Sequence, residues 1–377
     1  MEEYFCATMS KHGKILVAMS GGIDSTVAAV MLHNEGWEVI GMTMKTWDYA
    51  SSGGSKKETG CCNLDSINDA RSVAVDLGFP HYIIDIREEF GDAVIENFVD
   101  EYLAGRTPNP CVLCNTHIKW NALLRRAKIL GCEFIATGHY AQVRSENNRF
   151  IVSKGHDDWK DQSYVLWGLT QPVLAITKFP LGGFRKTEIR KMCEDWGYKE
   201  LAKKSESYEI CFIPDNDYRG FLKRRVNGLE EKVAGGNFIL RDGTVVGKHE
   251  GYPFYTIGQR KGLNIALGKP MFVTDINPET NTVILGDEEE LNRTGMIVGG
   301  INLVKYDSIN DGMESISKVR YKDAGTPSYL FNDGKNIRVE FHTQVKGIAP
   351  GQSAVMYEGN DLLGGGIIQK SFDLKLG

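Results

Sequence analysis

The chain has 377 residues, of which 42% are hydrophobic and 25% charged, and its formal net charge is -5 at pH 7. These values are typical of globular proteins and exclude collagen-like, disordered and disulfide-scaffold classes. No apolar run reaches membrane-spanning length and the first residues are polar, so we expect a cytoplasmic protein without a membrane segment. In that compartment the eight cysteines should be mostly reduced, so their spacing bears on reactivity or metal binding.

In the first half of the chain, short apolar runs alternate with helical patterns. The runs predict strands at 14–19, 38–44, 81–85 and 133–137, and the patterns between them predict helices near 25–35, 64–77, 88–104 and 116–130. Such alternation is typical of a mostly parallel sheet with helices on both faces. All cysteines and tryptophans lie at or before Cys211, and short alternating segments with Asp-Gly turns follow Val226. This change predicts two small β-rich domains after the α/β domain.

The first strand-to-helix turn has the composition of a phosphate-binding loop. It comprises Ser20, Gly21, Gly22, Ile23, Asp24 and Ser25. Two glycines let backbone N–H groups surround an anion, two serines add hydroxyl donors, and the helix N-terminus adds positive charge. The turn lacks the lysine of a Walker A loop and the glycine spacing of a dinucleotide fingerprint. It resembles the pyrophosphate loop of the N-type ATP pyrophosphatases; the alternative is an ordinary glycine turn before a helix.

Ligands of parallel sheets bind at the carboxyl ends of the strands. Met44 ends the second predicted strand and Gly138 follows the fourth, so both should meet the nucleotide if the loop binds ATP. The resemblance to the pyrophosphatases implies that ATP is cleaved to AMP and pyrophosphate and that a carbonyl oxygen is activated as an adenylate.

Cys111 and Cys114 lie in a segment that begins with two prolines around Asn109. Those prolines oppose helix formation, so we expect a stiff, exposed loop that ends with Cys114 at a helix N-terminus, where a thiolate is stabilised. Half of a zinc site is the alternative, but no second pair of suitable ligands follows. The other cysteine of interest is Cys211, whose local pattern fits a buried core cysteine equally well.

Many segments in order along nearly the whole chain are similar to the bacterial and mitochondrial tRNA-specific 2-thiouridylases. The matching segments include Ser20–Ser25, Met44–Trp47, Gly105–Pro110, Cys114–Asn115, Ala136–Ala141, Lys160–Tyr164, Ile210–Ile213, Gly247–His249, Tyr255–Leu263, Arg320–Tyr321, Pro350–Gln352 and Gly364–Ile367. The resemblance implies an α/β fold with three domains: an ATP pyrophosphatase domain at 1–215, a small tRNA-contacting domain at 216–288 and a tRNA-binding β-barrel at 289–377.

The resemblance also implies the reaction. Members of the family form 2-thiouridine at the wobble uridine of tRNAs of the Lys, Glu and Gln type, using ATP, with Mg²⁺ expected, to adenylate the oxygen at C2. It assigns ATP binding to Ala18, Met19, Ser20, Gly21, Gly22, Ile23, Asp24, Ser25, Met44 and Gly138.

The resemblance gives two cysteines catalytic roles. Cys211 carries a persulfide, and Cys114 frees its terminal sulfur or closes a disulfide with Cys211. A persulfide donor, such as a cysteine desulfurase or a sulfur-relay protein, is therefore an expected partner besides tRNA.

Contact with the target base falls to Asn109, Pro110 and Cys111, where the family usually has aspartate in place of Cys111. A thiol is a weaker hydrogen-bond acceptor than a carboxylate and lacks its usual proton shuttle, so either Cys111 acts as a thiolate or another group such as Asp24 or His139 contributes. A sharper alternative is an iron–sulfur cluster, of the [4Fe–4S] type, held by Cys111, Cys114 and Cys211. A second departure lies at Glu206–Glu209, before Cys211.

Contacts with tRNA are expected in spite of the net negative charge. The resemblance assigns them to His139, Lys160, Asp161, Gln162, Arg320, Tyr321 and Gln352. Basic clusters at 116–130, 183–204 and 217–226 could follow an RNA backbone, whereas the acidic segment 85–101 should face away from them; solvated helix faces are the alternative. Trp120 and Trp159 could stack on bases, but tryptophans of this kind more often belong to the core.

Two other functions stay open at this stage. An ammonia-using ligase of the same pyrophosphatase class would have no use for Cys114 and Cys211. A tRNA-binding protein without catalytic activity would have no need of an intact Ser20–Ser25 loop.

Overall fold

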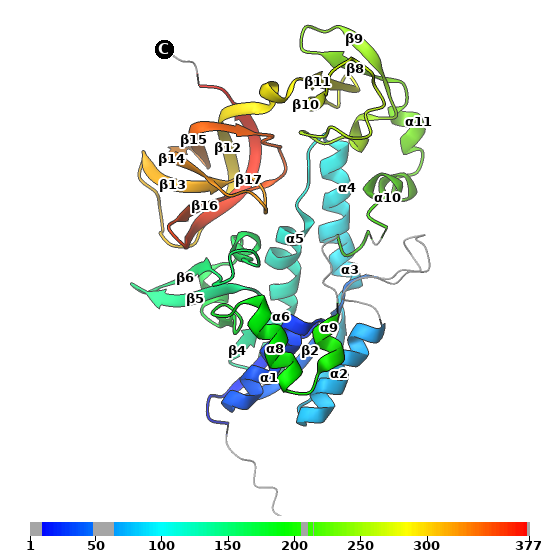
Figure 1. Cartoon of the computed structure of the whole chain (residues 1–377). Coiled ribbons are helices and arrows are strands. Elements are labelled where there is room, and N and C mark those ends of the chain that lie inside the picture. Colours follow the sequence, from blue (N-terminus) through cyan, green and yellow to red (C-terminus); the bar gives the residue numbers. More distant parts are fainter. Residues whose placement is uncertain (1–9, 48–63, 205–209, 214, 375–377) are drawn as a thin grey trace, which may run out of the picture.

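The computed structural model describes residues 10–47, 64–204, 210–213 and 215–374 (Figure 1). Figure 1 shows an α/β body at the bottom, a β-rich unit at the upper right and a barrel at the upper left. No helix in the described part of the chain is long and apolar enough to cross a membrane.

The α/β body is built on a five-stranded parallel sheet of order β3-β2-β1-β4-β7. Its strands are β1 (Lys14–Ala18), β2 (Glu38–Lys45), β3 (His81–Asp85), β4 (Phe134–Ala136) and β7 (Thr177–Lys178). The four strands predicted from apolar runs are therefore confirmed. The chain leaves β1 toward β2 and returns on the other side of β1 to form β4, so the strand order reverses between β1 and β4, which is where open α/β sheets bind ligands.

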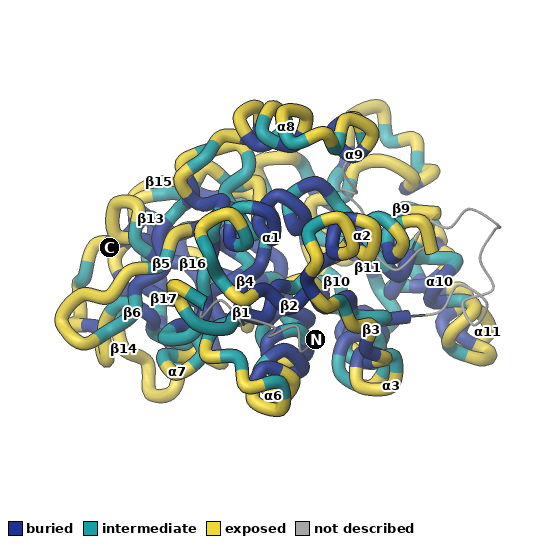
Figure 2. Tube along the Cα trace, turned by 90° about the horizontal axis from the view of Figure 1, so that it is seen from below, coloured by how far each residue is buried: buried dark blue, intermediate teal, exposed yellow. Residues whose placement is uncertain are grey.

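Helices cover both faces of this sheet, as the alternating pattern predicts. Ile15 and Val17 pack with α1 (Ile23–Glu35) and α2 (Leu64–Leu77), whereas Leu16 between them packs with α6 (Trp120–Leu130) on the other face. Successive side chains of a strand point to opposite faces, which is why the two cores share one strand. Figure 2 shows the central strands buried between the helices. The remaining helices of the body are α3 (Arg87–Phe90), α4 (Glu96–Leu103), α5 (Pro110–Leu113), α7 (Gln171–Leu174), α8 (Lys186–Asp195) and α9 (Lys199–Lys203).

Two of the predicted helices contain wider, π-helical turns. The helix expected at 88–104 is divided into α3 and α4 by η2 (Gly91–Ile95), and η3 (Cys114–Lys119) joins α5 to α6. Such turns often occur at functional sites. The 3-10 segments are η4 (Ser163–Leu166), η5 (Tyr252–Phe254) and η6 (Glu288–Leu291).

The second half of the chain forms two β-rich units, as expected. The first has α10 (Tyr218–Arg225), α11 (Leu229–Val233), β8 (Gly236–Leu240), β9 (Val245–His249), β10 (Phe272–Asn277) and β11 (Thr282–Gly286), in the sheet order β10-β11-β8-β9. The second has β12 (Asn292–Leu303), β13 (Met313–Lys318), β14 (Thr326–Asp333), β15 (Asn336–Lys346), β16 (Ser353–Glu358) and β17 (Asp361–Phe372). Because β12 pairs with both β15 and β17, the second unit closes into a barrel and leaves no open edge there.

A hairpin of the α/β body, β5 (Ala141–Glu146) and β6 (Arg149–Lys154), continues the barrel sheet through β17. Asp361 on β17 binds this hairpin: its carboxylate accepts hydrogen bonds from Arg144 at 2.8 and 2.9 Å and from Ser153 at 2.7 Å. Lys305 after β12 adds a third donor at 2.8 Å. The hydrogen bonds from Arg144 are the main reason that the pKa of Asp361 lies below its ordinary value.

We expect Asp361→Asn to lower the free energy of unfolding by about 1–2 kcal/mol at pH 7, because Arg144 and Lys305 each lose one of their two anionic partners, the others being Glu146 and Glu358. The folded-state pKa of Asp361 is depressed, so its contribution is complete above the ordinary value near 3.8 and is lost as the pH falls through the folded-state value. Thermal unfolding of both proteins between pH 7 and pH 2 should show their melting temperatures converging in acid. Asp307→Asn is the matched control, because the Asp307 side chain, which pairs with Arg149, is 88% exposed. Equal losses in both variants would contradict the prediction.

Candidate active site

The Ser20–Ser25 loop connects the end of β1 to α1 and is held by its own hydroxyl groups. The Ser25 Oγ accepts a hydrogen bond from the Ser20 N–H at 3.0 Å and donates one to the Gly22 carbonyl at 3.1 Å. Gly21 has φ +72°, a conformation that favours glycine. The loop therefore stands preformed before the N-terminus of a 13-residue helix, as a phosphate site requires.

The strand ends meet at this loop. A Cβ atom on Gly138 would lie 2.7 Å from the Ser25 nitrogen, so the backbone after β4 passes directly against the loop. Ala18 ends β1 and Met44 lies in the last two residues of β2, at the same edge of the sheet. The structure therefore brings together residues for which we expect ATP contacts.

Asp24 is bound by Tyr140, which follows β4, and by Lys186, which the sequence did not single out as part of the site. Its carboxylate accepts hydrogen bonds from the Lys186 ammonium at 2.7 and 2.8 Å and from the Tyr140 hydroxyl at 2.7 Å. The Lys186 side chain is only 9% exposed and also lies over the Tyr140 ring. A buried cation therefore stands beside a loop suited to anions. In the sequence, Lys186 was noticed only as part of the basic segment 183–204, which we interpreted as an RNA-binding cluster.

The segment around Cys111 and Cys114 differs from the expected stiff loop. The helix begins at Pro110, so Cys114 lies a full turn inside it and is buried instead of standing at its N-terminus. The reason is that Asn109 caps the helix, with its Oδ1 accepting from the Val112 N–H at 3.4 Å, and that proline is well tolerated at the first helical position. Cys111, in the first turn, is exposed.

Cys211 is held at the edge of an aromatic cluster. Its neighbour Phe212 is buried and makes ring contacts with Phe90, Phe98 and Phe221, at centroid distances of 5.8, 5.2 and 5.4 Å. Cys211 is half-buried and, like Cys114, contacts the large core that contains this cluster. The helix η3, which begins at Cys114, packs against α3 and η2. The two cysteines thus approach the same core from segments far apart in the sequence, while Glu206–Glu209 lies outside the described residues.

The donor set of the iron–sulfur alternative is not gathered. Within the described ranges no group of three or more His, Cys, Asp or Glu side chains could hold a metal ion, and Cys111, Cys114 and Cys211 all belong to those ranges.

His139 and Cys111 share an electrostatic environment. Desolvation, with a smaller contribution from the Lys119 ammonium, lowers the pKa of His139 to about 3, so the ring is neutral at physiological pH. Although the Cys111 side chain is accessible to solvent, protein surrounds it closely enough that desolvation raises the pKa of its thiol, against the effect of the same lysine. This shift favours the thiol over the thiolate that would replace the usual aspartate. His139 is also bound to Thr137, with Nδ1 and Oγ1 2.8 Å apart, and lies against Trp120.

The residues for which we expect tRNA contacts divide between two surfaces that face each other. Gln352 of the barrel donates hydrogen bonds to the carbonyls of Thr107 and Pro108 at 3.2 and 2.8 Å, next to Asn109. The Tyr321 hydroxyl donates to the Asp161 carbonyl at 2.9 Å, and Arg320 reaches the Lys346 carbonyl at 3.4 Å. Gln162 accepts from the Tyr140 N–H at 3.0 Å. The barrel therefore docks on the target-base segment through several of these residues.

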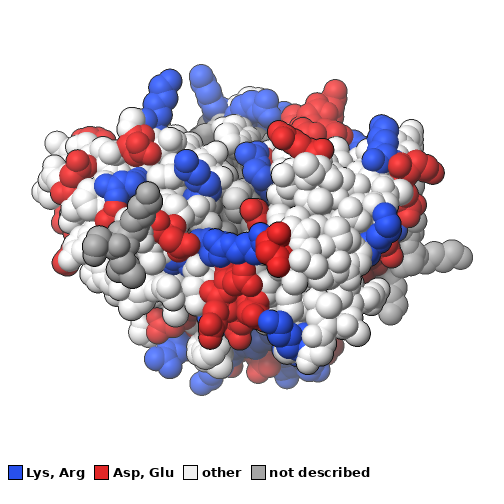
Figure 3. All heavy atoms as spheres, turned by 90° about the horizontal axis from the view of Figure 1, so that it is seen from above, with Lys and Arg blue, Asp and Glu red and all other residues white. Residues whose placement is uncertain are grey.

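The expectation that the acidic segment 85–101 faces away from the basic clusters is wrong. Glu89 pairs with Arg125 at 3.5 Å, and Glu96 pairs with Arg225. In the cluster 217–226, Lys223 also pairs with Glu230 at 2.7 Å and Arg224 with Asp215 at 3.3 Å. These partners neutralise charge that the sequence alone leaves unbalanced. Figure 3 shows both signs interspersed on the face that carries the barrel and the central unit.

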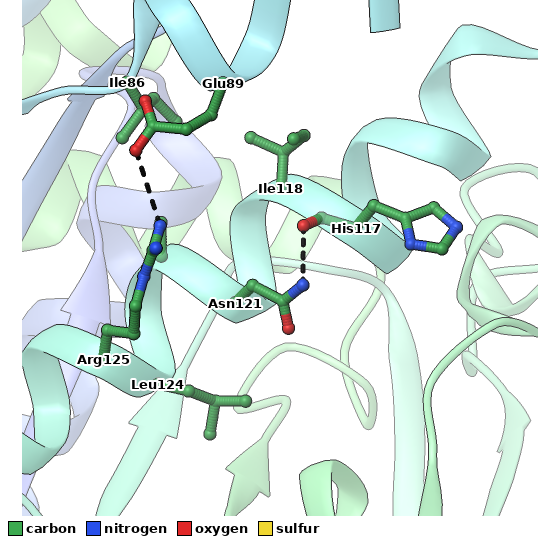
Figure 4. A pocket seen from close by; sticks show the side chains of 8 residues that line it. Ile86, Glu89, His117, Ile118, Asn121, Leu124 and Arg125 are labelled. Carbon is green, nitrogen blue, oxygen red and sulfur yellow. Dashed lines mark hydrogen bonds and ion pairs between the residues drawn. The ribbon is translucent and has the colours of Figure 1, made fainter. Parts of the chain in front are cut away.

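The outer side of η3 and α6, the helical segments that follow α5, forms a pocket of about 410 Å³ (Figure 4). Arg125 and Glu89 face each other across it, and the Asn121 amide donates to the His117 carbonyl at 2.8 Å. Lining residues come from η3, α6 and α3, including Ile86 and Ile118. None of the residues expected to bind ATP lines this pocket, so it is separate from the phosphate loop.

Comparison with protein families gives three matches in order along the chain. The family models described as the tRNA methyl transferase HUP domain, the tRNA methyl transferase PRC-barrel domain and the aminomethyltransferase beta-barrel domain match residues 13–215, 219–287 and 293–368.

Curated relatives are similar over almost their full length. The tRNA-specific 2-thiouridylase MnmA of Cytophaga hutchinsonii is 68% identical over 97% of this chain and 99% of its own. Those of Amoebophilus asiaticus and Salinibacter ruber are 65% and 58% identical, over 96% of this chain and 96% of their own in each case. Among solved structures, a 4-thiouridine synthetase–RNA complex with bound ATP is 18% identical, covering 58% of this chain and 51% of that chain, with a TM-score of 0.37, too low to support an argument.

Proposed function

Because the chain belongs to the tRNA-specific 2-thiouridylase family, whose reaction is the thiolation of tRNA, we propose the chemical course of that reaction for this protein. ATP adenylates the C2 oxygen of the wobble uridine, in tRNAs of the Lys, Glu and Gln type, and persulfide-derived sulfur then replaces that oxygen. The observation that supports the proposal is the contact between the Ser20–Ser25 loop and the backbone of Gly138, the residue directly before His139.

In the first step the uridine oxygen attacks the α-phosphate and pyrophosphate leaves. Backbone N–H groups of Gly21 and Gly22, the Ser25 hydroxyl and the N-terminus of α1 favour the developing negative charge, and Lys186 adds a fixed positive charge. Mg²⁺ fits this site only in part, since both oxygens of Asp24 are bound to Lys186. Asp24 is the carboxylate that would help to hold Mg²⁺ beside the loop, and the ion would supply neutralisation of phosphate charge.

In the second step the terminal sulfur of a Cys211 persulfide attacks C2 and AMP leaves. Cys114 then attacks the Cys211 sulfur, so a Cys114–Cys211 disulfide forms and the sulfur stays on C2 as a thiocarbonyl. A thiol reductant restores both cysteines, and a persulfide donor, a cysteine desulfurase or a sulfur-relay protein, recharges Cys211. Cys111, protonated in its site, can donate a hydrogen bond to the base but cannot repeat the role of an aspartate.

We propose different roles for the three structural units. We assign the chemistry to residues 1–215 and tRNA contacts to residues 216–288 and 289–377, with Gln352 and Tyr321 of the barrel closing over the target-base segment. The uridine must leave the anticodon stack to reach Asn109, as in other enzymes that modify a base.

The test is a reaction with ATP, a persulfide donor and unmodified tRNA, followed by analysis of the nucleosides. We expect 2-thiouridine, AMP and pyrophosphate in equal amounts, all dependent on tRNA. A tRNA whose wobble base is not uridine is the control and should give none of the three. Incorporation of ammonia in place of sulfur would favour the ligase alternative, and absence of tRNA-dependent pyrophosphate release would favour a binding protein without activity.

A further inference from the structure

Trp159 is 94% exposed, more than any other large hydrophobic side chain in the described part of the chain. Trp120, the other tryptophan considered for base stacking, is fully buried in the core. Trp159 follows β6 in the turn that leads to η4, beside the barrel. A single exposed apolar side chain is common, so its meaning depends on how the chain holds it and on what surrounds it.

The turn that carries Trp159 is fixed from three sides. The Asp157 carboxylate accepts hydrogen bonds from the Trp159 N–H at 3.1 Å and from the Lys186 N–H, at the start of α8, at 2.9 Å. Asp161 accepts from the N–H groups of Gly155 and Ser163 at 3.1 and 3.0 Å, and its carbonyl accepts from Tyr321 of the barrel. A ligand that stacks on Trp159 therefore meets a preorganised backbone and need not order it.

The surroundings combine cations with a second aromatic ring. Lys160 follows Trp159 directly, and the ammonium groups of Lys154 and Lys318 lie 4.9 and 5.7 Å from the centroid of the Tyr357 ring, which is buried in the barrel. Tyr321 is 39% exposed. The carboxylates of Asp157 and Asp161 are used by the turn itself, as described above, while Asp158 stays exposed. Exposed rings beside lysines are the combination by which proteins hold single-stranded nucleic acid.

We propose that Trp159 is a tRNA-binding residue that stacks on an unpaired base of the tRNA while the neighbouring lysines contact phosphates. The inference rests on the proposed function for the identity of the RNA. To the tRNA contacts already expected, the inference adds stacking by the Trp159 ring. Every base has a π-face, so such stacking needs no particular RNA sequence.

The experiment measures tRNA affinity over a range of salt concentrations for the full chain and for Trp159→Ala, Trp159→Leu and Trp159→Phe. We expect the alanine and leucine variants to bind on the order of 5- to 100-fold more weakly, and phenylalanine to retain most of the affinity, because the π-face and not the apolar area is what stacks. The salt dependence should keep its slope in all three, since no charge is removed, whereas Lys160→Ala should lower the slope by about 1.

Tyr82→Ala is the matched control, because Tyr82 is an aromatic side chain, 46% exposed, on the edge strand β3 of the α/β sheet, and it should leave tRNA affinity unchanged. ATP affinity and melting temperature should not change in any Trp159 variant. Quenching of wild-type fluorescence by tRNA, reduced in Trp159→Phe, would support the contact independently. Unchanged tRNA affinity in the alanine and leucine variants would overturn the inference. A loss of affinity for the sulfur donor alone would also overturn it, because Trp159 would then be a residue that docks a protein. Failure of the wild type to bind tRNA would instead contradict the proposed function.

Discussion

Cys211→Ala is expected to abolish 2-thiouridine formation, by at least about a thousandfold, while tRNA-dependent release of pyrophosphate continues. The reason is that adenylation needs the phosphate loop but no thiol, whereas the second step needs a sulfur atom to carry the persulfide. The measurement is parallel analysis of nucleosides and of pyrophosphate in the same reaction. Adenylated tRNA, or AMP formed by its hydrolysis, should accumulate in place of the thiolated product.

Cys193→Ala is the control for this variant. Cys193 is fully buried between α1 and the α8–α9 pair, and desolvation raises the pKa of its thiol to about 11, so it is inert as a nucleophile. It should lose some stability but keep the ratio of 2-thiouridine to pyrophosphate. Cys114→Ser should also form no free 2-thiouridine, because without Cys114 the sulfur on C2 stays in a disulfide with Cys211. Retained 2-thiouridine in Cys211→Ala would overturn the persulfide assignment, and the cluster alternative with it, because both need the Cys211 thiol.

Gly21→Ala should reduce both pyrophosphate release and thiolation by at least about a hundredfold. A Cβ atom at this position would lie 1.9 Å from the Ser66 carbonyl oxygen of α2, and φ is +72°, so the loop must move and adopt a strained backbone. The positive φ alone costs roughly 1 kcal/mol in a non-glycine residue, and displacement of N–H groups that bind phosphate costs more. Steady-state pyrophosphate release and equilibrium binding of ATP are the measurements.

The adjacent glycine provides the comparison. Gly22 has φ -88°, and the nearest atom to a Cβ there is the Ser20 Oγ at 3.5 Å, which is ordinary contact. Gly22→Ala should therefore bind ATP much better than Gly21→Ala, although both glycines belong to the proposed phosphate site. If the two variants were equally impaired, glycine would be needed there for approach of the nucleotide and not for the conformation of the loop.

Local patterns were sufficient for the strands of the α/β body and for its phosphate loop. The runs at 14–19 and 38–44 are apolar on both faces because helices cover both faces of the sheet, so β1 and β2 could be recognised from composition alone. The barrel was also expected, but its closure depends on the pairing of β12 with β17, which are separated by more than 50 residues.

The sequence was less informative wherever a short polar contact or a distant partner decides the outcome. Two prolines around Asn109 suggested a loop, yet the Asn109 cap makes Pro110 the start of a helix and draws Cys114 inside it. Glu89 and Glu96 were expected to avoid the basic clusters that they in fact neutralise. Trp120 and Trp159 were both considered for base stacking, and one is buried whereas the other is exposed.

What the sequence determined by itself was the family and the parallel sheet, because these depend on residue type and on order along the chain. What only the tertiary structure decided was which polar groups meet. The Lys186 ammonium binds Asp24, 162 residues away in the sequence, and the Gln352 amide binds the Pro108 carbonyl, 244 residues away. Contacts over such separations depend on how helices and sheets are packed, and packing free energy is shared among many residues, so no local pattern specifies the partner.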